Sequence, residues 1–329
     1  MSNYRSIVGQ KIKKVTSDPS NLVEGQLWYN STTGVLKGAQ LNASAWASGG
    51  NLNEGRFGMG SAQNGTQTAA LCATGTEGPP WPGIVTSVEE YDGSSWSEVN
   101  NNTTGRESLS GSGTQTAGLI FGGGGDSDAT EEYDGTNWTT TGNLNTPIYH
   151  NGGCGIQTAS LNFGGYNPGT SAKSGVTEEY NGSAWTVNPN SLGTPRQTLR
   201  GCGIQTAALA IGGNANPPNA SVGNTEEYDG SSWTAGGALG TARQDGGSAG
   251  VQTNAIYFSG DIVPGSQSVL TEGYNGTSWS SLPNVASGRS QGGAAGTQAA
   301  GLFFGGGAGG NATEEFTGST LQGKTITTS

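Results

Sequence analysis

Residues 203–207 read Gly-Ile-Gln-Thr-Ala, and the same phrase occurs six times in the chain with at most two changes. Its glutamines, 48, 42, 48, 47 and 46 residues apart, are Gln67, Gln115, Gln157, Gln205, Gln252 and Gln298. Glu-Glu-Tyr-Asp-Gly or a near copy keeps step at 89–93, 131–135, 178–182, 226–230, 272–276 and 314–318. A tryptophan does the same at 46, 96, 138, 185, 233 and 279. Repeats of roughly 40 to 50 residues made of short strands and turns are typical of a solenoid or a propeller.

The composition favours strands over helices. The chain has 61 Gly among 329 residues, and 31% of its residues are hydrophobic. Glycine costs roughly 1 kcal/mol at a helix interior position, so long helices are disfavoured along most of the chain. Such a composition also occurs in disordered segments. We expect a folded chain, because every repeat supplies aromatic and aliphatic residues at regular places and disordered segments lack them.

One repeat, taken from 242 to 280, divides into four expected strands. Residues 242–249 are small and Gly-rich, as an innermost strand near a crowded axis requires. Residues 251–259 form an apolar run that is typical of a strand buried on both faces. Residues 270–274 and 278–280 follow, joined by Asn275-Gly276, a strong hairpin signal.

At this level the chain resembles the kelch family of β-propellers, over residues 41 to 318. A paired glycine ends the second strand, a tyrosine follows, and a tryptophan comes five residues later. The glycine pairs are Gly122-Gly123, Gly164-Gly165, Gly212-Gly213 and Gly305-Gly306. An arginine opens the next repeat, at Arg56, Arg106, Arg196, Arg243 and Arg289. The departures are Thr74-Gly75, Ser259-Gly260 and Ile148, which stands where the third repeat would carry arginine.

Six copies predict an all-β, six-bladed kelch-like β-propeller with four-stranded blades around a central channel. The last copy ends at residues 314–318 without a following tryptophan, whereas Trp46 precedes the first complete repeat. We therefore expect the strand around Ser44-Ala45-Trp46 to complete the last blade and close the ring, which removes an exposed edge. Residues 35–41 also resemble the third strand of a blade. The alternative is therefore that the N-terminus contributes two strands to the last blade and displaces part of the C-terminal tail. The expected organisation is an anchoring arm and hairpin at 1–40 and a propeller at 41–329.

Residues 1–40 differ in charge from the rest. They carry five Lys or Arg against two acidic residues, a balance of +3, and the remaining chain sums to −14. A basic arm suggests docking to an acidic partner, and a solvated, flexible terminus is the alternative. Residues 24–37 are similar to a phrase near the starts of phage appendage subunits, and the repeats are similar to those of marine and cyanobacterial phage proteins. This resemblance implies a virion protein whose anchoring residues are Arg5, Lys11, Lys13, Lys14, Trp28 and Tyr29.

The sequence offers few signs of membrane, nucleic-acid or secretory function. Residues 1–23 lack the continuous apolar core of a signal peptide, and no apolar run is long enough to predict a transmembrane helix. The net charge of −11 and the absence of a basic cluster outside the arm disfavour nucleic-acid binding. We expect a virion component that is assembled in the host bacterial cytoplasm, with other virion proteins as partners and no membrane insertion.

Catalytic chemistry is also disfavoured, and we expect a protein that is not an enzyme and has no metal or cofactor. His150 is the only histidine, so a multi-histidine metal centre is excluded. Adjacent residues on a strand point to opposite faces, so the Glu-Glu pairs cannot act together on one substrate. We expect one Glu of each pair to meet a repeat arginine between blades. Cys72, Cys154 and Cys202 are expected to be small buried residues without disulfides.

The loops between the second and third strands vary from repeat to repeat, and variable loops on a rigid scaffold are the usual place of recognition. Aromatic and polar side chains there could stack on and hydrogen-bond a sugar. The candidate binding residues are Trp81, Asp126, Asp128, Tyr166, Asn167-Pro168, Asn214, Asn216 and Asp261. The alternative is that these aromatics only cap blade edges.

Three functions remain open at this stage. The first is a phage tail-fibre or capsid-decoration protein that is anchored by residues 1–40 and presents its loops to host-surface glycans. The second is a stand-alone lectin-like module, which binds sugar as a monomer and does not need the arm. The third is a glycan-acting enzyme, which would depend on one asymmetric carboxylate.

Overall fold

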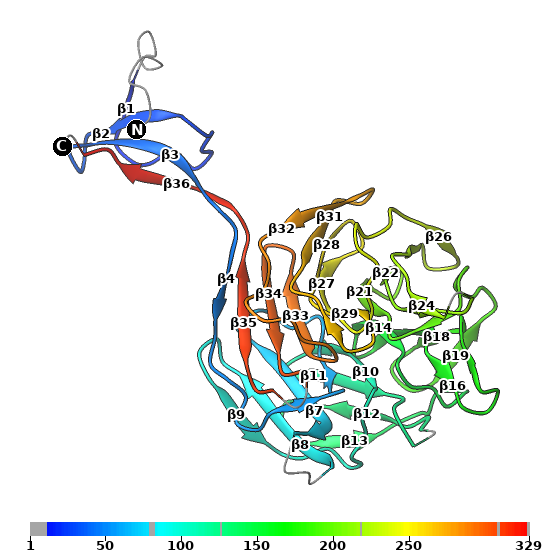
Figure 1. The fold of residues 1–329 in the computed structure, drawn as a ribbon. Coiled ribbons are helices and arrows are strands. Elements are labelled where there is room, and N and C mark those ends of the chain that lie inside the picture. Colours follow the sequence, from blue (N-terminus) through cyan, green and yellow to red (C-terminus); the bar gives the residue numbers. More distant parts are fainter. Residues whose placement is uncertain (1–11, 79–82, 126, 218, 308–309, 328–329) are drawn as a thin grey trace. The chain divides into compact units, whose positions relative to one another are not determined.

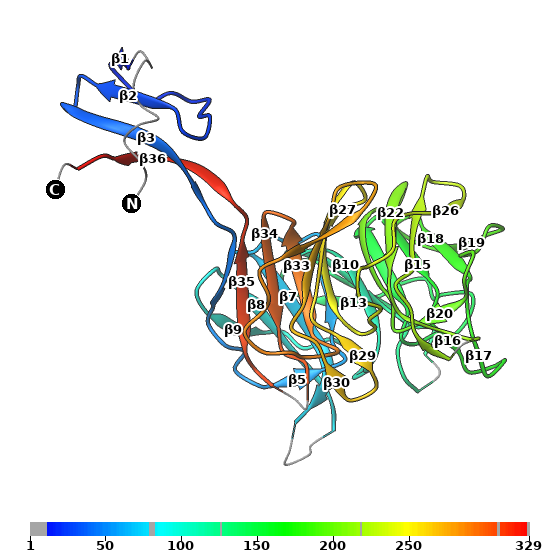
Figure 2. The ribbon, with the colours of Figure 1, turned by 45° about the horizontal axis from the view of Figure 1, so that its top comes forward.

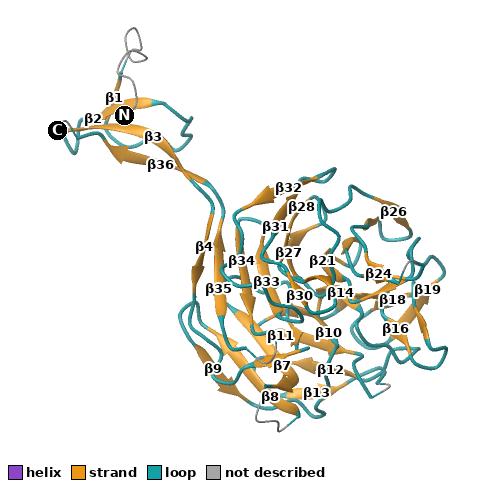
Figure 3. Ribbon diagram, viewed as in Figure 1, coloured by secondary structure: helices purple, strands orange, loops and turns teal. Residues whose placement is uncertain are grey.

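The structure is a computed structural model that describes residues 12–78, 83–125, 127–217, 219–307 and 310–327. Within these ranges the regular elements are 36 strands and no helix (Figures 1 and 3). In the same part of the chain no helix is long and apolar enough to cross a membrane. The chain is therefore all-β, as the glycine-rich composition predicts.

The chain divides into two compact units. The terminal unit comprises Met1–Ala45 with Gly318–Ser329, and the repeat unit comprises Trp46–Thr317. The sequence predicts a division at 40/41 and does not indicate that the C-terminal residues join the N-terminal ones. They do so as the fourth strand of a small sheet, whose order is β1 (Lys13–Val15), β2 (Leu27–Asn30), β3 (Val35–Asn42) and β36 (Thr320–Thr325).

Six main sheets build the described part of the repeat unit, one for each sequence repeat. They are numbered here as repeats 1 to 6. Repeat 1 contains β5 (Arg56–Phe57), β7 (Ala70–Glu77), β8 (Ile84–Tyr91) and β9 (Trp96–Val99), with β6 (Gly60–Ser61) beside β7. Repeat 2 contains β10 (Ser110–Thr114), β11 (Ala117–Phe121), β12 (Thr130–Tyr133) and β13 (Trp138–Thr140). Repeat 3 contains β14 (Gly152–Ile156), β15 (Ala159–Phe163), β18 (Thr177–Tyr180) and β19 (Trp185–Asn188).

The other three sheets follow the same order. Repeat 4 contains β21 (Arg200–Ile204), β22 (Ala207–Ile211), β25 (Thr225–Tyr228) and β26 (Trp233–Ala235). Repeat 5 contains β27 (Gly247–Val251), β28 (Asn254–Phe258), β31 (Thr271–Tyr274) and β32 (Trp279–Leu282). Repeat 6 contains β33 (Gly293–Thr297), β34 (Ala300–Phe304), β35 (Thr313–Thr317) and β4 (Ala45–Ser48). The strand around Trp46 thus completes the last sheet, as predicted.

The innermost strands lie side by side in chain order (Figures 1 and 2). Strands β10, β14, β21, β27 and β33 contact one another in succession, and β6 contacts both β10 and β33. Glycine and other small residues make this approach possible; a Cβ on Gly201, for instance, would lie 2.7 Å from the carbonyl oxygen of Gly153. The arrangement is that of a β-propeller-like fold.

The core lies between neighbouring sheets. The second strand of each sheet is buried on both faces, as Ala255–Phe258 illustrate with no exposed surface. Leu161 of repeat 3 packs with Ala208 and Tyr228 of repeat 4, and Leu302 of repeat 6 packs with Ala70 of repeat 1. Each sheet therefore depends on its neighbours for a complete hydrophobic core.

The first two strands of repeat 5 differ from the prediction in their bounds: the first begins at Gly247 and not at residue 242, and the second begins at Asn254 and not at residue 251. The sequence places Val251 in the second strand of repeat 5, but it ends the first strand, and the turn comes at Gln252 and Thr253. The repeat glutamine therefore lies in a turn, from which its side chain reaches the preceding repeat. Gln252 Nε2 donates to the carbonyl oxygens of Ala208 and Tyr228 at 3.1 and 2.6 Å.

Equivalent residues just before the innermost strands form a cycle of backbone hydrogen bonds. All have a positive φ between 54° and 64°: Gly58, Ser108, His150, Thr198, Asp245 and Gln291. Each donates its N–H to the carbonyl of the corresponding residue in the preceding repeat, at 2.7 to 2.9 Å. The N–H of Gly58 donates to Gln291 O at 2.9 Å, so the series returns to its starting point.

Candidate functional site

The repeat arginines are structural cations. Each pairs with the first Glu of the pair in its own repeat, for example Arg56 with Glu89 at 2.6 Å and Arg106 with Glu131 at 2.8 Å. The other pairs are Arg196–Glu226, Arg243–Glu272 and Arg289–Glu314. Four of the five guanidinium groups also donate to the carbonyl oxygen just after the second strand, as Arg106 does to that of Gly122 at 2.8 Å, whereas Arg56 donates to Ser87 O at 2.7 Å. The expected contact between one Glu and a repeat arginine is confirmed in these five repeats, but it lies within one repeat and not between blades, because the arginine opens the same repeat that carries its carboxylate.

Repeat 3 shows what replaces the missing arginine. Glu178 is buried, and it accepts hydrogen bonds from the backbone and side-chain nitrogens of Asn145, both at 2.8 Å. Burial raises the pKa of Glu178, and these hydrogen bonds limit the rise. Ile148 occupies the arginine position as a buried hydrophobic residue.

The second Glu of each pair bonds to the neighbouring repeat through a tyrosine. Tyr133 Oη donates to Glu90 Oε1 at 2.9 Å, and Tyr180 Oη donates to Glu132 Oε1 at 2.8 Å. Both members of a Glu pair are therefore engaged in the scaffold. In the described part of the chain no group of three His, Cys, Asp or Glu residues could hold a metal ion. The three cysteines are free and buried, as predicted, and burial raises the pKa of Cys72 and Cys202 to about 12.

The variable loops of repeats 3, 4 and 5 form three small hairpins. Their strands are β16 (Tyr166–Asn167) with β17 (Ala172–Lys173), β23 (Asn214–Ala215) with β24 (Ala220–Ser221), and β29 (Asp261–Val263) with β30 (Ser266–Gln267). Strand β20 (Arg196–Gln197) pairs with β23. In repeat 1 the corresponding hairpin is continuous with the main sheet: the extended ends of β7 and β8 pair at Gly75–Val85 and Thr76–Ile84, and β5 pairs with β7. In the described residues of repeats 2 and 6 no such hairpin is present, so the loop face is asymmetric.

Hydrogen bonds link the three hairpins into one surface. Lys173 Nζ contacts Asn214 Oδ1 and also donates to Asn219 Oδ1 at 2.7 Å. Asn214 Nδ2 donates to Gln244 Oε1 at 2.8 Å. The backbone N–H of Gln244 and that of Asp261 donate to each other's carbonyl oxygens at 2.9 and 2.8 Å. This connected surface over repeats 3 to 5 is the candidate binding site.

The structure brings only some of the predicted binding residues to this surface. Tyr166 is half-buried, and its ring centroid lies 5.1 Å from that of Tyr149. Asn167 Oδ1 accepts the N–H of Thr170 at 3.2 Å. Pro168 is half-buried, and Asn216 is exposed.

The remaining predicted binding residues are less available. Asn214 and Asp261 are 8% exposed and hold the hairpins together, so they act in the scaffold. Asp128 lies in repeat 2 and accepts from Asn143 Nδ2 at 3.1 Å. Trp81 and Asp126 lie outside the described residues.

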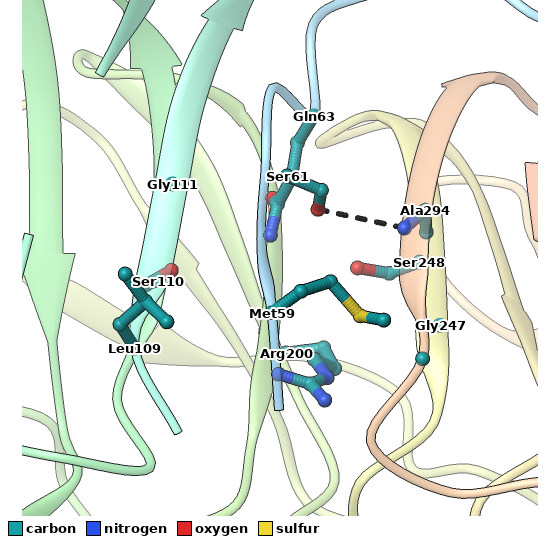
Figure 4. A pocket seen from close by; sticks show the side chains of 11 residues that line it. Met59, Ser61, Gln63, Leu109, Ser110, Gly111, Arg200, Gly247, Ser248 and Ala294 are labelled. Carbon is teal, nitrogen blue, oxygen red and sulfur yellow. Dashed lines mark hydrogen bonds between the residues drawn. The ribbon is translucent and has the colours of Figure 1, made fainter. Parts of the chain in front are cut away.

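A small polar cavity lies between the innermost strands (Figure 4). Its volume is about 10 Å³, room for about one water molecule. The lining includes the hydroxyl groups of Ser61, Ser110 and Ser248 and the guanidinium group of Arg200. Gln63 lines it too; in the orientation that satisfies its amide, Nε2 donates to the carbonyl oxygens of Gly153 and Gly201 at 2.8 and 2.5 Å. Repeat 1 is thereby tied to repeats 3 and 4 across the centre of the unit.

Arg200 is the charged group of this cavity, and two titratable groups are close to it. Its Nη2 atom lies 3.9 Å from Asp245 Oδ1. Burial raises the pKa of Asp245 to about 7, partly offset by Arg200 and increased by Asp261. Burial, and to a lesser extent Arg200, lowers the pKa of His150 to about 4. His150 is therefore neutral at pH 7, and its backbone N–H and carbonyl belong to the cycle of hydrogen bonds described above.

Residue-by-residue comparison of the repeats could have found Arg200. The first strand has glycine or serine at the equivalent positions: Gly60, Ser110, Gly152, Gly247 and Gly293. A charged side chain in that series is a break in the pattern. The sequence did not indicate that Tyr149 and Lys173 belong to the candidate site, because their neighbours come from loops that differ in every repeat.

In the terminal unit, Asp18 is the central polar residue. Its Oδ1 accepts from Trp28 Nε1 at 3.0 Å and from Asn30 Nδ2 at 2.9 Å, and its Oδ2 lies 2.6 Å from Lys37 Nζ. The hydrogen bond from Lys37, followed by those from Asn30 and Trp28, lowers the pKa of Asp18 to about 2. One residue therefore links the loop before β2 with strands β2 and β3.

The predicted anchoring residues fall into three groups. Trp28 is fully buried and belongs to the core of the terminal unit, so a partner cannot reach it in the folded chain. Tyr29 is 38% exposed, and Lys13 and Lys14 are exposed. Arg5 and Lys11 lie outside the described residues.

No protein-family model matches the chain, and no curated protein matches it at a significant level. Among solved structures the fold is well represented. A structure described as "Structure of YjhT" has a TM-score of 0.65 and 13% sequence identity, and the match covers 82% of this chain and 99% of that chain. At this identity the likeness concerns the fold alone.

Proposed function

We propose that the repeat unit is a closed, six-bladed, kelch-like β-propeller in which β4 completes the last blade. The backbone cycle from Gly58 to Gln291 supports this proposal, since each repeat contributes one bond to it. Gln67 supports it further: its Nε2 atom in repeat 1 donates to Gly301 O and Phe316 O of repeat 6, at 3.0 and 2.7 Å. In a closed ring every blade packs against a neighbour on both sides, so no blade is left at an open end. Such a ring suits a rigid display scaffold.

We also propose that the chain is a structural appendage protein of a phage virion, either a tail fibre or a capsid decoration. The observation that carries this proposal is the segregation of charge between the units. The terminal unit has six Lys or Arg against two acidic residues, a net charge of +4. The repeat unit has seven against 22, a net charge of −15. A small basic unit beside a large acidic one suits attachment by the first and display by the second.

The displayed surface in this proposal is the loop face of repeats 3 to 5, with host-surface glycan as its target. The Tyr149–Tyr166 pair offers aromatic faces, and exposed Asn216 and Asn219 offer amide groups for hydroxyl recognition. The role is binding without catalysis, because the paired glutamates are used in the scaffold. Location in the virion after cytoplasmic assembly follows from the same proposal.

Electron microscopy and mass spectrometry of purified phage particles that encode the chain test the virion role. Density that fits both units, together with peptides of the chain in washed particles, is the expected result. Absence of the chain from particles would reject the virion role.

A stand-alone lectin-like module is the second candidate, favoured by the connected hairpin surface. A glycan array probed with the full chain, Tyr166→Ala and the matched distal control Tyr29→Ala tests the loop face. Loss of glycan binding in Tyr166→Ala alone is expected in either case. The lectin would be favoured if the monomeric chain binds sugar fully and is absent from purified particles.

A further inference from the structure

The sheet of the terminal unit has two unlike faces. Residues that are opposite in register share a face. Lys13, Trp28 and Lys37 are opposite one another on one face, and Lys14, Tyr29 and Leu36 on the other. Asp18 binds the side chains of Trp28, Asn30 and Lys37, so its loop covers the first face.

The second face, called the open face here, is apolar with basic flanks. Its apolar part is Leu27, Tyr29, Leu36 and Ile326, with Lys14 and Lys324 on the edge strands, and Gln40 and Gln322 continue the same face along β3 and β36. Leu27 and Ile326 belong to it because their side chains lie within 3.3 Å of the position that a Cβ on Gly38 would occupy. Tyr29 is 38% and Ile326 37% exposed. These register positions carry two lysines and no carboxylate.

We propose that the open face is the docking surface for an acidic partner protein, and this inference rests on the proposed anchoring role of the terminal unit. A sheet that exposes apolar side chains on one face is normally covered by another layer. The charge of the face indicates which partner can cover it. Lys14 and Lys324 are complementary to a partner whose carboxylates surround an apolar contact. A second copy docked face to face would instead bring these lysines toward equivalent lysines.

An anionic membrane is a weaker fit for the same face. Recognition of acidic lipids generally relies on clusters of roughly four to eight basic residues. The open face carries Lys14 and Lys324, at opposite edge strands of the sheet. Two separated cations suit a protein surface whose carboxylates are placed to match them.

The test uses the full chain and a fluorescent random copolymer of glutamate and tyrosine, with polyglutamate and phosphatidylserine vesicles as comparison probes. Strand β1 offers a matched pair of variants. Lys14→Glu changes the open face, and Lys13→Glu makes the same charge change on the covered face. We expect Lys14→Glu to weaken copolymer binding about fivefold and Lys13→Glu to leave it within about twofold.

A second pair of variants tests the apolar part. Tyr29→Ser removes an exposed aromatic from the open face, whereas Leu41→Ser removes an exposed aliphatic side chain from the other face. We expect Tyr29→Ser alone to remove the preference for the copolymer over polyglutamate. Amide hydrogen exchange of peptides from residues 13–42, followed by mass spectrometry, reports whether the variants keep the folded sheet.

Three results would overturn the inference. Equal loss in Lys13→Glu and Lys14→Glu would indicate unspecific attraction by net charge. Tighter, Tyr29-dependent binding to vesicles would assign the face to a membrane, and Tyr29-dependent self-association would assign it to a second copy. Absence of the chain from phage particles would reject the virion role but leave a positive copolymer result intact, so the two failures are distinguishable.

Discussion

Tyr133 Oη donates to Glu90 Oε1 at 2.9 Å, and this bond joins repeat 2 to repeat 1. The same pair recurs as Tyr91–Glu315, Tyr180–Glu132, Tyr228–Glu179 and Tyr274–Glu227. Between repeats 5 and 6 both partners change, since Gly273 replaces the Glu and Phe316 the Tyr. Trp46 packs on Phe316 there, with ring centroids 5.2 Å apart. Donor and acceptor are therefore lost together, which leaves neither group buried and unpaired.

Tyr133→Phe is expected to lower the free energy of unfolding by about 1–2 kcal/mol, because a hydrogen bond to a carboxylate is lost. Phe316→Tyr is the matched change at the junction without an acceptor, and it should also destabilise the protein, since its hydroxyl lacks the Glu. Urea denaturation measures both. A stabilising Phe316→Tyr would contradict this account of the junction.

Val88→Thr is expected to stabilise the protein by about 1 kcal/mol. The indole nitrogens of the other repeat tryptophans donate to threonines of the neighbouring repeat, as Trp185 Nε1 does to Thr130 Oγ1 at 2.9 Å. Trp138 packs beside buried Val88, and in the described structure its Nε1 has no partner. The reciprocal variant Thr130→Val should cost a similar amount. Thermal and urea denaturation measure the change in free energy of unfolding for both variants. A change of the same sign in both would reject the explanation.

Ser259 holds a positive φ of 59° where repeats 2, 3, 4 and 6 have glycine and repeat 1 has Thr74, with a φ of 56°. Its Oγ lies 3.0 and 2.6 Å from the carbonyl oxygens of Ser268 and Arg289, which share its single proton, and it accepts the Arg289 N–H at 2.7 Å. Ser259→Gly relieves the backbone but loses these bonds, and Ser259→Ala loses them without relief. We expect the free energy of unfolding to be highest for the parent, lower for the Gly variant and lowest for the Ala variant. The two variants should differ by about 1 kcal/mol. A Gly variant more stable than the parent would show that backbone strain outweighs the bonds.

Asp245 and His150 should give opposite pH dependences of stability. The pKa of Asp245 is about 7, above its ordinary value of 3.8, so the folded protein keeps a proton that the unfolded chain releases. Its contribution to stability therefore falls as pH rises from about 4 to 7. The pKa of His150 is about 4, below 6.5, so its contribution rises with pH over about 4 to 6.5.

The variants separate these two contributions. Asp245→Asn should gain stability relative to the parent as pH rises from 4 to 7, and His150→Gln should gain it as pH falls from 6.5 to 4. Urea denaturation at a series of pH values gives the difference from the parent. Parallel profiles for parent and variants would show that the two groups titrate normally.

Ring closure is testable through the repeat glutamines. If the six blades form the proposed ring, Gln67→Ala should destabilise the protein as much as Gln157→Ala, by about 2 kcal/mol for two lost hydrogen bonds. Both side chains donate to two carbonyl oxygens of the preceding repeat. A Gln67→Ala variant as stable as the parent would favour an open array of repeats.

Much of the scaffold was readable from single residues. The glycine-rich first strands, the buried second strands and the Asn-Gly or Asp-Gly turns follow from local sterics and hydrophobicity, and the strand at Trp46 followed from counting tryptophans. The sequence predicted that one Glu of each pair meets a repeat arginine, and five repeats show this contact. Which Glu it is, and in which repeat, could not be predicted, because alternation along a strand says only that two adjacent glutamates point apart. Most of the candidate site could not be predicted from the sequence. Asn214 and Asp261 looked like exposed loop residues, yet they hold adjacent hairpins together.

By itself, the sequence determined the all-β class, the sixfold repetition and the exclusion of a multi-histidine centre, since these depend on residue type and spacing. Only the tertiary structure decided that Thr320–Thr325 join the N-terminal sheet, that Trp28 is core while Tyr29 is surface, and that Arg200 lies beside Asp245. Each of these depends on which distant segments come together. Such pairings gain their energy from burial and hydrogen bonds between segments, and no local pattern in either segment encodes the partner.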